Sequence, residues 1–374
     1  MDKHLHIVCL DVPYPPDYGG VFDLFYKLPY LKELGVKIHL HCFEYGRGEQ
    51  AELNKYCETV NYYERRKGHK GFSLKWPYIV SSRASEALIQ NLCADDYPVL
   101  LEGIHCSYFL HEGRLAGRKV ILRLHNIEYL YYRQLSRHAG SLLRKIYYWN
   151  ESRLLKKYER DIAKKADLVL AVSEKDARIY EAPFGTGSIK FLPVFLPWSH
   201  VLLKEGLGSF CLYHGNLSVS ENENVAVWLL KNVFKDLGLP FVIAGKNPSN
   251  RLQKLVNEIS NACLVSNPSV DEMKDLIAKA QIHVLPSFNS TGVKLKLLNA
   301  LFCGRHCVVN EEMVELTGLE EACHIAANAE GFKSILIQLF HRPFTEDEIQ
   351  IRRGLLSKYY DNVLNAQRLI RWIW

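Results

Sequence analysis

Short apolar runs separated by helix-like segments constrain the fold of this chain more than any other feature of its sequence. These runs are apolar on both faces. They lie at 5–12, 36–43, 97–103, 118–126, 166–173, 188–195, 209–215, 239–245, 262–266, 281–287 and 306–310. Strands of this kind are typical of parallel sheets with helices on both faces. The sequence therefore predicts an α/β fold built from doubly wound sheets.

The chain is long enough for two hydrophobic cores. Its 374 residues exceed the length that one core usually serves, and 48% apolar with 24% charged residues is typical of a compact protein. Periodicity is lost over 181–209, a stretch rich in Pro and Gly that is predicted to be a linker. We expect one Rossmann-like domain over 1–195 and a second over 205–345. A terminal helix at about 350–374 is expected to cross back to the first domain, because its final segment RLIRWIW is too apolar for solvent.

Charge and cysteine content exclude several classes of protein. The net charge of +6 is spread along the chain without a dense basic stripe, so we expect no nucleic-acid partner. The ten cysteines form no CxxC pair, and several lie in apolar runs, as expected for buried thiols in a reducing compartment. Cys303, His306 and Cys307 lack a second ligand pair at zinc-site spacing and are predicted to be core residues. The polar start, Met1 to His6, and the lack of a membrane-length apolar run predict a cytoplasmic protein.

Common nucleotide and hydrolase motifs are missing from the sequence. No GxGxxG follows a strand-like run, and neither GxxxxGK[ST] nor GxSxG occurs. These absences argue against a dinucleotide oxidoreductase, a P-loop NTPase and an α/β-hydrolase. Two parallel-sheet domains bind ligands at the carboxyl ends of their strands, so we expect the function to lie in the loops there.

Two of these loops belong to the first domain. Gly19 and Gly20 stand at an expected helix start, where missing side chains allow an anion to approach backbone N–H groups. His125 ends a strand-like run, where an imidazole can bond a sugar hydroxyl or a reacting oxygen. A tight turn and a structural histidine are the plainer alternatives.

The segment PSFNSTGVKLKLLNALFCG, residues 286–304, is the strongest candidate in the second domain. Thr291 is expected to cap a helix whose first turn Gly292 leaves open. Lys296 follows Gly292 by four residues on the same helical face and is expected to reach back over a phosphate, while Lys294 points toward solvent. A solvated helix face is the alternative interpretation.

Taken in order, the motifs of this chain resemble those of retaining GT-B glycosyltransferases of the family-four type. The resemblance covers nearly the whole chain. Its motifs are YPPDYGG (14–20), RLHN (123–126), YERDIAKKADLVLAVSEKD (158–176), HGNLSVSENENVAVWL (214–229), FVIAGKNPS (241–249) and AKAQIHVLPSFNSTGVKLKLLNALFCGRHCVV (278–309). The order and spacing of these motifs, rather than any one of them, carry the resemblance.

The resemblance implies two Rossmann-like domains facing across a cleft. It implies transfer of a hexose from a nucleotide diphosphate sugar to an acceptor hydroxyl, with retention of anomeric configuration, in bacterial polysaccharide or glycolipid synthesis. No metal and no cofactor apart from the donor are implied, and the acceptor is a carbohydrate or is lipid-linked. The implied catalytic residues are Gly20, His125 and Lys296. The implied donor-binding residues are Gly19, Gly215, Asn216, Lys246, Pro268, Ser269, Val270, Thr291, Gly292, Val293 and Asn299.

The sequence departs from the family pattern at two places. Members of the family carry two glutamates eight residues apart. The corresponding positions in this chain are Thr291 and Asn299, so both carboxylates are missing. A catalytically silent nucleotide-sugar-binding protein is therefore one alternative function. A sugar-nucleotide epimerase is another, and it requires acid and base carboxylates for which Glu102 and Glu128 are the candidates.

Residues 136–165 mix aromatic and basic side chains, and this segment has two possible interpretations. Such a segment can rest peripherally on an anionic membrane, which suits a lipid-linked acceptor at the inner face of the membrane. An ordinary amphipathic helix packed on the sheet is the alternative.

Overall fold

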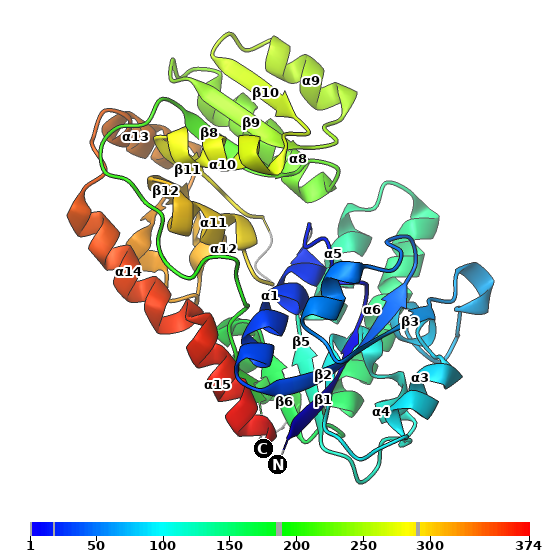
Figure 1. The fold of residues 1–374 in the computed structure, drawn as a ribbon. Helices are drawn as coiled ribbons and strands as arrows, with labels where there is room; N and C mark the ends of the chain where they lie inside the picture. The colour runs from blue at the N-terminus through cyan, green and yellow to red at the C-terminus, as the bar shows by residue number, and fades with distance from the viewer. Residues whose placement is uncertain (1, 18, 185–188, 289–291) are drawn as a thin grey trace. The chain divides into compact units, whose positions relative to one another are not determined.

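The computed structural model describes residues 2–17, 19–184, 189–288 and 292–374. The chain forms two compact units (Figure 1). The first comprises Met1–Pro197, Thr291–Val293 and Tyr360–Trp374, and the second comprises Trp198–Ser290 and Lys294–Tyr359. Each is an α/β unit around a parallel sheet, which confirms the predicted fold class.

The first unit, blue to green in Figure 1, is built on a seven-stranded sheet in the order β3-β2-β1-β4-β5-β6-β7. Every pair in it is parallel. Its strands are β1 Lys3–Cys9, β2 Val36–Glu44, β3 Thr59–Glu64, β4 Val99–Glu102, β5 Val120–Leu124, β6 Leu168–Ala171 and β7 Ile189–Phe191. The central strands β4, β5 and β6 are buried along their whole length, as expected for a sheet covered on both faces.

Helices complete the core of this unit. They are α1 Gly19–Glu33, α2 Tyr78–Ser81, α3 Glu86–Leu92, α4 Tyr108–His111, α5 Glu128–His138, α6 Leu142–Ala163, α7 Glu174–Phe184 and α15 Asn362–Ile373. The last of them, red in Figure 1, buries Ala366, Leu369 and Ile373 in the core of the first unit. This burial gives the apolar end of the chain the partner that the sequence requires.

The second unit has a six-stranded parallel sheet in the order β10-β9-β8-β11-β12-β13. Its strands are β8 Cys211–Asn216, β9 Phe241–Lys246, β10 Ala262–Ser266, β11 Ile282–Val284, β12 His306–Val309 and β13 His324–Ile325. Its helices are α8 Ser220–Leu229, which continues as a π-helical turn over Leu230–Phe234, then α9 Asn250–Asn257, α10 Val270–Lys279, α11 Leu295–Cys303, α12 Glu311–Val314, α13 Ala329–Phe340 and α14 Glu346–Tyr360. In each sheet the strand order reverses beside the first strand, at β1 and at β8, which is where doubly wound sheets bind ligands.

Three local expectations differ from the structure. The terminal helix is broken into α14 and α15, because Asp361 starts a new helix by accepting a hydrogen bond from the N–H of Leu364. Only α15 belongs to the first unit. The predicted linker 181–209 contains the end of α7 and all of β7, and the units change at Pro197.

The third difference lies in the candidate donor segment. Helix α11 begins at Leu295, so the prediction that Gly292 occupies its first turn is wrong. Gly292 has φ of +72°, in the left-handed region that a right-handed helix does not use, and Lys294 takes the N-cap position. Thr291, the expected cap, lies outside the described residues.

The cysteines follow the prediction. Cys9, Cys42 and Cys211 are buried, and all ten thiols are free. Within the described residues, no helix has both the length and the apolar character needed to span a membrane.

Candidate active site

Lys296 lies in the first turn of α11 and contacts uncharged groups of the second unit. Its Nζ donates to Asn222 Oδ1 at 2.8 Å, lies 3.4 Å from the hydroxyl oxygen of Tyr213, and sits 5.1 Å from the centroid of that ring. Both hydrogen-bond partners found for it among the described residues are neutral. A half-buried ammonium with neutral partners gains from an anion, since charge-assisted hydrogen bonds are stronger than neutral ones.

The same hydrogen-bond network reaches the loop after β8. Asn222 Nδ2 donates to the carbonyl of Asn216 at 2.9 Å, and the Tyr213 hydroxyl donates to the carbonyl of Asn222 at 2.9 Å. Asn216 Oδ1 accepts from both the backbone and the hydroxyl of Ser218. The structure thus links two predicted donor residues, Asn216 and Lys296, through Asn222, which the sequence did not single out.

Burial has a marked effect on the ammonium of Lys296. It lowers the pKa of Lys296 to about 8, while Glu221 opposes the shift and Lys294 adds to it. Burial also lowers the pKa of His214 to about 3, with a smaller contribution from Lys296. The contribution of Lys296 to the local positive charge therefore weakens as the pH rises above about 8.

Two glycines let the strands of this unit approach closely beside the network. A Cβ on Gly245, in β9, would lie 1.9 Å from the carbonyl oxygen of Gly215, in β8. No side chain fits there, so the loops after these strands can lie side by side only with glycine at this position. Lys246 follows Gly245 and is exposed, in register with Asn216.

Three of the predicted donor-binding residues, Pro268, Ser269 and Val270, follow β10. Ser269 caps α10 through a capping box with Glu272, and Val270 leaves 72% of its surface exposed. Pro268 is half-buried beside them. In the next loop, Gly292, Val293 and Asn299 are half-buried, and Asn299 follows Lys296 by three residues in α11. The structure describes where these residues lie. Their contact with a donor remains a prediction.

In the first unit, Gly19 and Gly20 open α1, as the sequence predicts. His125 directly follows β5, also as predicted. Its Nε2 lies 2.8 Å from Glu102 Oε2 at the end of β4, and its Nδ1 lies 4.0 Å from Asp23 Oδ2 in α1. The side chain of His125 is 13% exposed, whereas those of Asp23 and Glu102 are essentially buried. The imidazole is thus held by a buried carboxylate and keeps a small exposed surface.

These carboxylates belong to a buried ionic network. Arg123 donates to both oxygens of Asp23, at 2.6 and 3.0 Å, and to the carbonyls of Leu192 and Pro193. Lys27 forms ion pairs with Asp23 and Glu102. Although burial would raise the pKa values of both carboxyls, the charges of Arg123 and Lys27 lower that of Asp23, and Lys27 and His125 lower that of Glu102. Two carboxylates and two cations balance each other in the interior.

Asp23, Glu102 and His125 have the residue types of a metal site, and their ligand atoms lie within 4.8 Å of one another. However, both carboxylates already pair with Lys27, and Asp23 also pairs with Arg123. A divalent cation there would add to a region already neutralised by two fixed cations. We therefore interpret the group as the support for His125.

The sequence analysis missed Asp23, Lys27 and Arg123. Arg123 is fully buried inside an apolar strand, and Asp23 and Lys27 are i,i+4 neighbours buried on α1. The sequence did contain a signal for them: charged residues stand at positions that the apolar periodicity assigns to the core. Glu128 opens α5 and is half-buried, and burial raises its pKa to about 7, with Arg83 opposing the shift.

Comparisons with known proteins agree with this architecture. Residues 209–342 match the family described as "Glycosyl transferases group 1". A Klebsiella pneumoniae protein titled "Uncharacterized 44.6 kDa protein in cps region" is 30% identical over 314 residues, covering 79% of each chain. Sucrose-phosphate synthase from Thermosynechococcus elongatus has a TM-score of 0.73 at 12% identity, over 99% of this chain and 98% of that one. Anabaena HepE, solved in complex with UDP and glucose, has a TM-score of 0.62 at 12% identity, over 99% of each chain.

Two parallel-sheet α/β units, matched in fold over nearly their whole length by such enzymes, define a protein of the GT-B class. The chain belongs to the group 1 glycosyltransferases. The region matched by the family lies in the second unit except for Thr291–Val293, and it contains Asn216, Asn222 and Lys296.

Proposed function

We propose that this glycosyltransferase moves a hexose from a nucleotide diphosphate sugar to an acceptor hydroxyl with retention of anomeric configuration. The observation that carries the proposal is the Lys296 ammonium, half-buried at the start of α11 with neutral hydrogen-bond partners. The diphosphate is the negatively charged part of such a donor. It supplies the anionic partner that the Lys296 ammonium does not find in Asn222 and Tyr213.

The charge of the leaving group explains why this lysine matters for the reaction. As the bond from the anomeric carbon to the phosphate oxygen breaks, negative charge develops on the departing diphosphate. The ammonium of Lys296 and the positive end of α11 are fixed in advance and stabilise that charge. Fixed protein charges then serve in place of a divalent ion, so we propose a reaction without a metal and with no cofactor besides the donor.

Retention requires the acceptor to attack on the face that the diphosphate leaves. We propose that the acceptor oxygen forms the new bond to the anomeric carbon while its proton passes to the departing phosphate oxygen. No protein nucleophile is then needed. We assign the hexose contact to His125, whose ring is held by Glu102, and a phosphate contact to the backbone at Gly20, which opens α1.

The biological setting of the reaction is supported by the relatives. One relative is described as lying in a cps region, and the structural neighbour HepE was solved with UDP and glucose. We therefore propose bacterial polysaccharide or glycolipid synthesis as the setting, with a carbohydrate or lipid-linked acceptor. The epimerase alternative is less well supported, because it requires both an acid and a base carboxylate. Glu102 is already paired with Lys27 and His125, so Glu128 is the one candidate left of the two.

Titration of the full chain with uridine, guanosine and adenosine diphosphates by calorimetry tests the proposal. We expect binding of one of them, followed by transfer from the matching sugar nucleotide to an acceptor panel. NMR of the product reports the anomeric configuration. Binding of a diphosphate without transfer or hydrolysis would support the catalytically silent alternative, and failure to bind any nucleotide would exclude a donor site.

A peripheral membrane contact is the second part of the proposal. The first turns of α6 expose large apolar side chains, with Leu142 at 72%, Leu143 at 81% and Trp149 at 53%. The packed-helix alternative therefore fails for this part of α6, although its second half buries Leu155 and Ile162. The same segment also carries exposed basic residues: Arg137, Arg144, Lys145, Arg153, Lys156 and Lys157.

Exposed apolar side chains together with exposed cations complement an anionic lipid surface. We propose that α6 rests on the inner face of the cytoplasmic membrane, where a lipid-linked acceptor is found. The free cysteines are consistent with that reducing compartment.

The double substitution L143S and I146S is expected to abolish flotation of the protein with phosphatidylglycerol vesicles, while the wild type floats and phosphatidylcholine vesicles recruit less of it. The substitution I337S, which removes an apolar side chain 58% exposed on α13, is the matched control and should float normally. Wild-type protein that stays at the bottom of the gradient, or self-associates through α6 instead, would overturn the membrane contact.

A further inference from the structure

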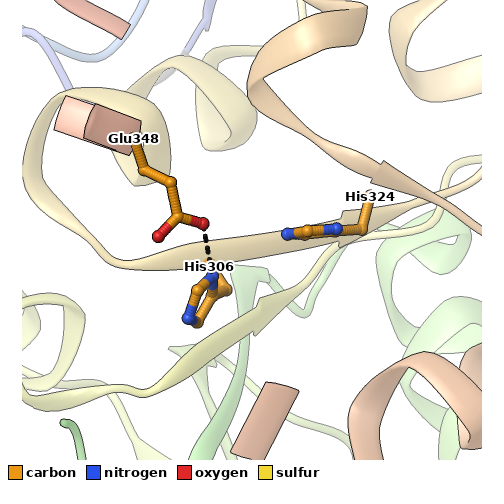
Figure 2. Close-up of side chains that lie close together, drawn as sticks. All are labelled: His306, His324 and Glu348. Atoms are coloured by element: carbon orange, nitrogen blue, oxygen red, sulfur yellow. Dashed lines mark ion pairs between the residues drawn. The ribbon is translucent and has the colours of Figure 1, made fainter. Parts of the chain in front are cut away.

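Three side chains of the second unit converge at the amino ends of its last two strands. His306 and His324 are the first residues of β12 and β13, and Glu348 lies in the first turn of α14 (Figure 2). Their ligand atoms lie within 4.8 Å of one another. The strands of this sheet run parallel. The cluster lies at their amino ends and Asn216 lies at the carboxyl end of β8, so the two are at opposite ends of the strands. The cluster is therefore separate from the proposed donor site.

The buried ring of His306 has one satisfied and one unsatisfied nitrogen. Its Nε2 lies 3.1 Å from the carbonyl oxygen of Arg342, which can only accept, so in the neutral ring the proton is on Nε2. Nδ1 then carries a lone pair, and among the described groups it has no hydrogen-bond partner. It faces Glu348 Oε1 at 3.3 Å (Figure 2), so two hydrogen-bond acceptors, each with a lone pair, face one another.

This arrangement is the one that metal ligands use. A ligating histidine commonly donates its other N–H to a backbone carbonyl, which fixes the tautomer and the orientation of the ring. A cavity of about 200 Å³ adjoins the cluster and is lined by His324, Glu348 and Cys323 among others, which leaves room for water at an open coordination position.

We propose that His306, His324 and Glu348 form a zinc site, with His306 Nδ1, an imidazole nitrogen of His324 and Glu348 Oε1 as protein ligands. Two imidazoles, one carboxylate and water are a common zinc ligand set, and zinc–nitrogen and zinc–oxygen distances of about 2.0–2.2 Å require the side chains to close in by roughly an ångström. The ion would tie the start of α14 to β12 and β13. Its role is to hold this edge of the sheet, and it is independent of sugar transfer.

One guanidinium competes with the metal. Arg342 donates to Glu348 Oε1 at 3.0 Å, but its side chain is 51% exposed and can turn into solvent. Arg352 lines the same cavity, but it donates to the carbonyls of Gly304 and Arg305 and not to Glu348. The other Glu348 oxygen accepts from the N–H and hydroxyl of Thr345, which orients the carboxylate without occupying Oε1.

Zinc titration of chelator-treated full-length protein, followed by calorimetry and thermal unfolding, tests the site. We expect one zinc ion per chain with a rise in melting temperature. H324Q and E348Q should each weaken binding at least 100-fold. Glutamine at 348 keeps an acceptor for Thr345, so α14 should remain folded. R342Q, which removes the competing guanidinium but keeps the carbonyl, should tighten binding.

Two controls separate this site from other histidines. H341Q alters a neighbouring histidine outside the cluster and should bind zinc normally. H39Q removes one member of the hydrogen-bonded pair His4–His39 in the first unit and should also be without effect. No zinc uptake by the wild type, or uptake unchanged in both H324Q and E348Q, would overturn the proposal and leave a shared proton between His306 and Glu348 as the explanation.

Discussion

Replacing Lys296 by alanine is expected to weaken binding of a nucleoside diphosphate about 10- to 100-fold, because a hydrogen bond to a charged group contributes about 1.5–3 kcal/mol. Transfer should fall further, by about 10² to 10³, since charge on the diphosphate grows in the transition state. The melting temperature should change little, because the substitution removes a charge whose partners Asn222 and Tyr213 are neutral. Calorimetry and initial rates measure the two effects.

Lys294 is the matched control for this substitution. It is half-buried at the N-cap of α11 and carries the same charge two residues away, so K294A should retain most of the binding. Equal losses in K294A and K296A would mean that net charge, rather than the placement of Lys296, attracts the donor.

The depressed pKa of Lys296 adds a dependence on pH. With a pKa of about 8, the free protein loses this charge as the pH rises through 8, so diphosphate affinity should decline there. Bound diphosphate raises the pKa, which extends the active range of the complex. K296R keeps its charge throughout, so any binding it retains should be flat across the same pH range.

Replacing Asp23 by alanine is expected to destabilise the first unit by about 3–5 kcal/mol, the usual cost of removing one partner from a buried ion pair. Arg123 and Lys27 would then share Glu102 as their remaining carboxylate in the network, and the N–H of Phe195 would lose its acceptor. At roughly 2–4 °C per kcal/mol for a unit of this size, the first unfolding transition should move down by about 6–20 °C.

An exposed pair provides the comparison for Asp23. Asp2 and Lys37 are 70% and 42% exposed at the side chain, and exposed pairs contribute little to stability. D2A should therefore leave the transition where it is. A small shift for D23A would show that the interior around Arg123 admits water or relaxes, and that His125 is held by other contacts.

The strand pattern of the chain was the part that sequence could predict. Buried parallel strands such as β5 and β6 are continuous apolar runs, and their helices follow at the expected spacing. The sequence placed His125 and Asn216 correctly at the ends of β5 and β8, because position at the end of a strand depends on local sequence. Their proposed contacts with a substrate remain predictions.

Features that depend on distant residues could not be predicted in the same way. Asp23 and Arg123 are 100 residues apart, and Lys296 and Asn222 are 74 apart, so neither pairing leaves a local pattern. The start of α11 was misplaced because a glycine in a turn and a glycine in a first helical turn look alike in sequence. The protruding start of α6 was ambiguous because its apolar side chains suit a core as well as a surface.

Helix α15 imposes an order of events on protein synthesis. It follows the whole second unit in the chain, yet Ala366, Leu369 and Ile373 pack in the core of the first unit, where α15 contacts α1. While the ribosome is still making residues 198–361, the surface of α1 that α15 covers has no apolar partner from this helix. The second unit can therefore finish folding before the first unit does. A nascent chain would thus carry an uncovered, aggregation-prone face until α15 emerges from the exit tunnel, and chaperones that bind such faces should associate with it until then.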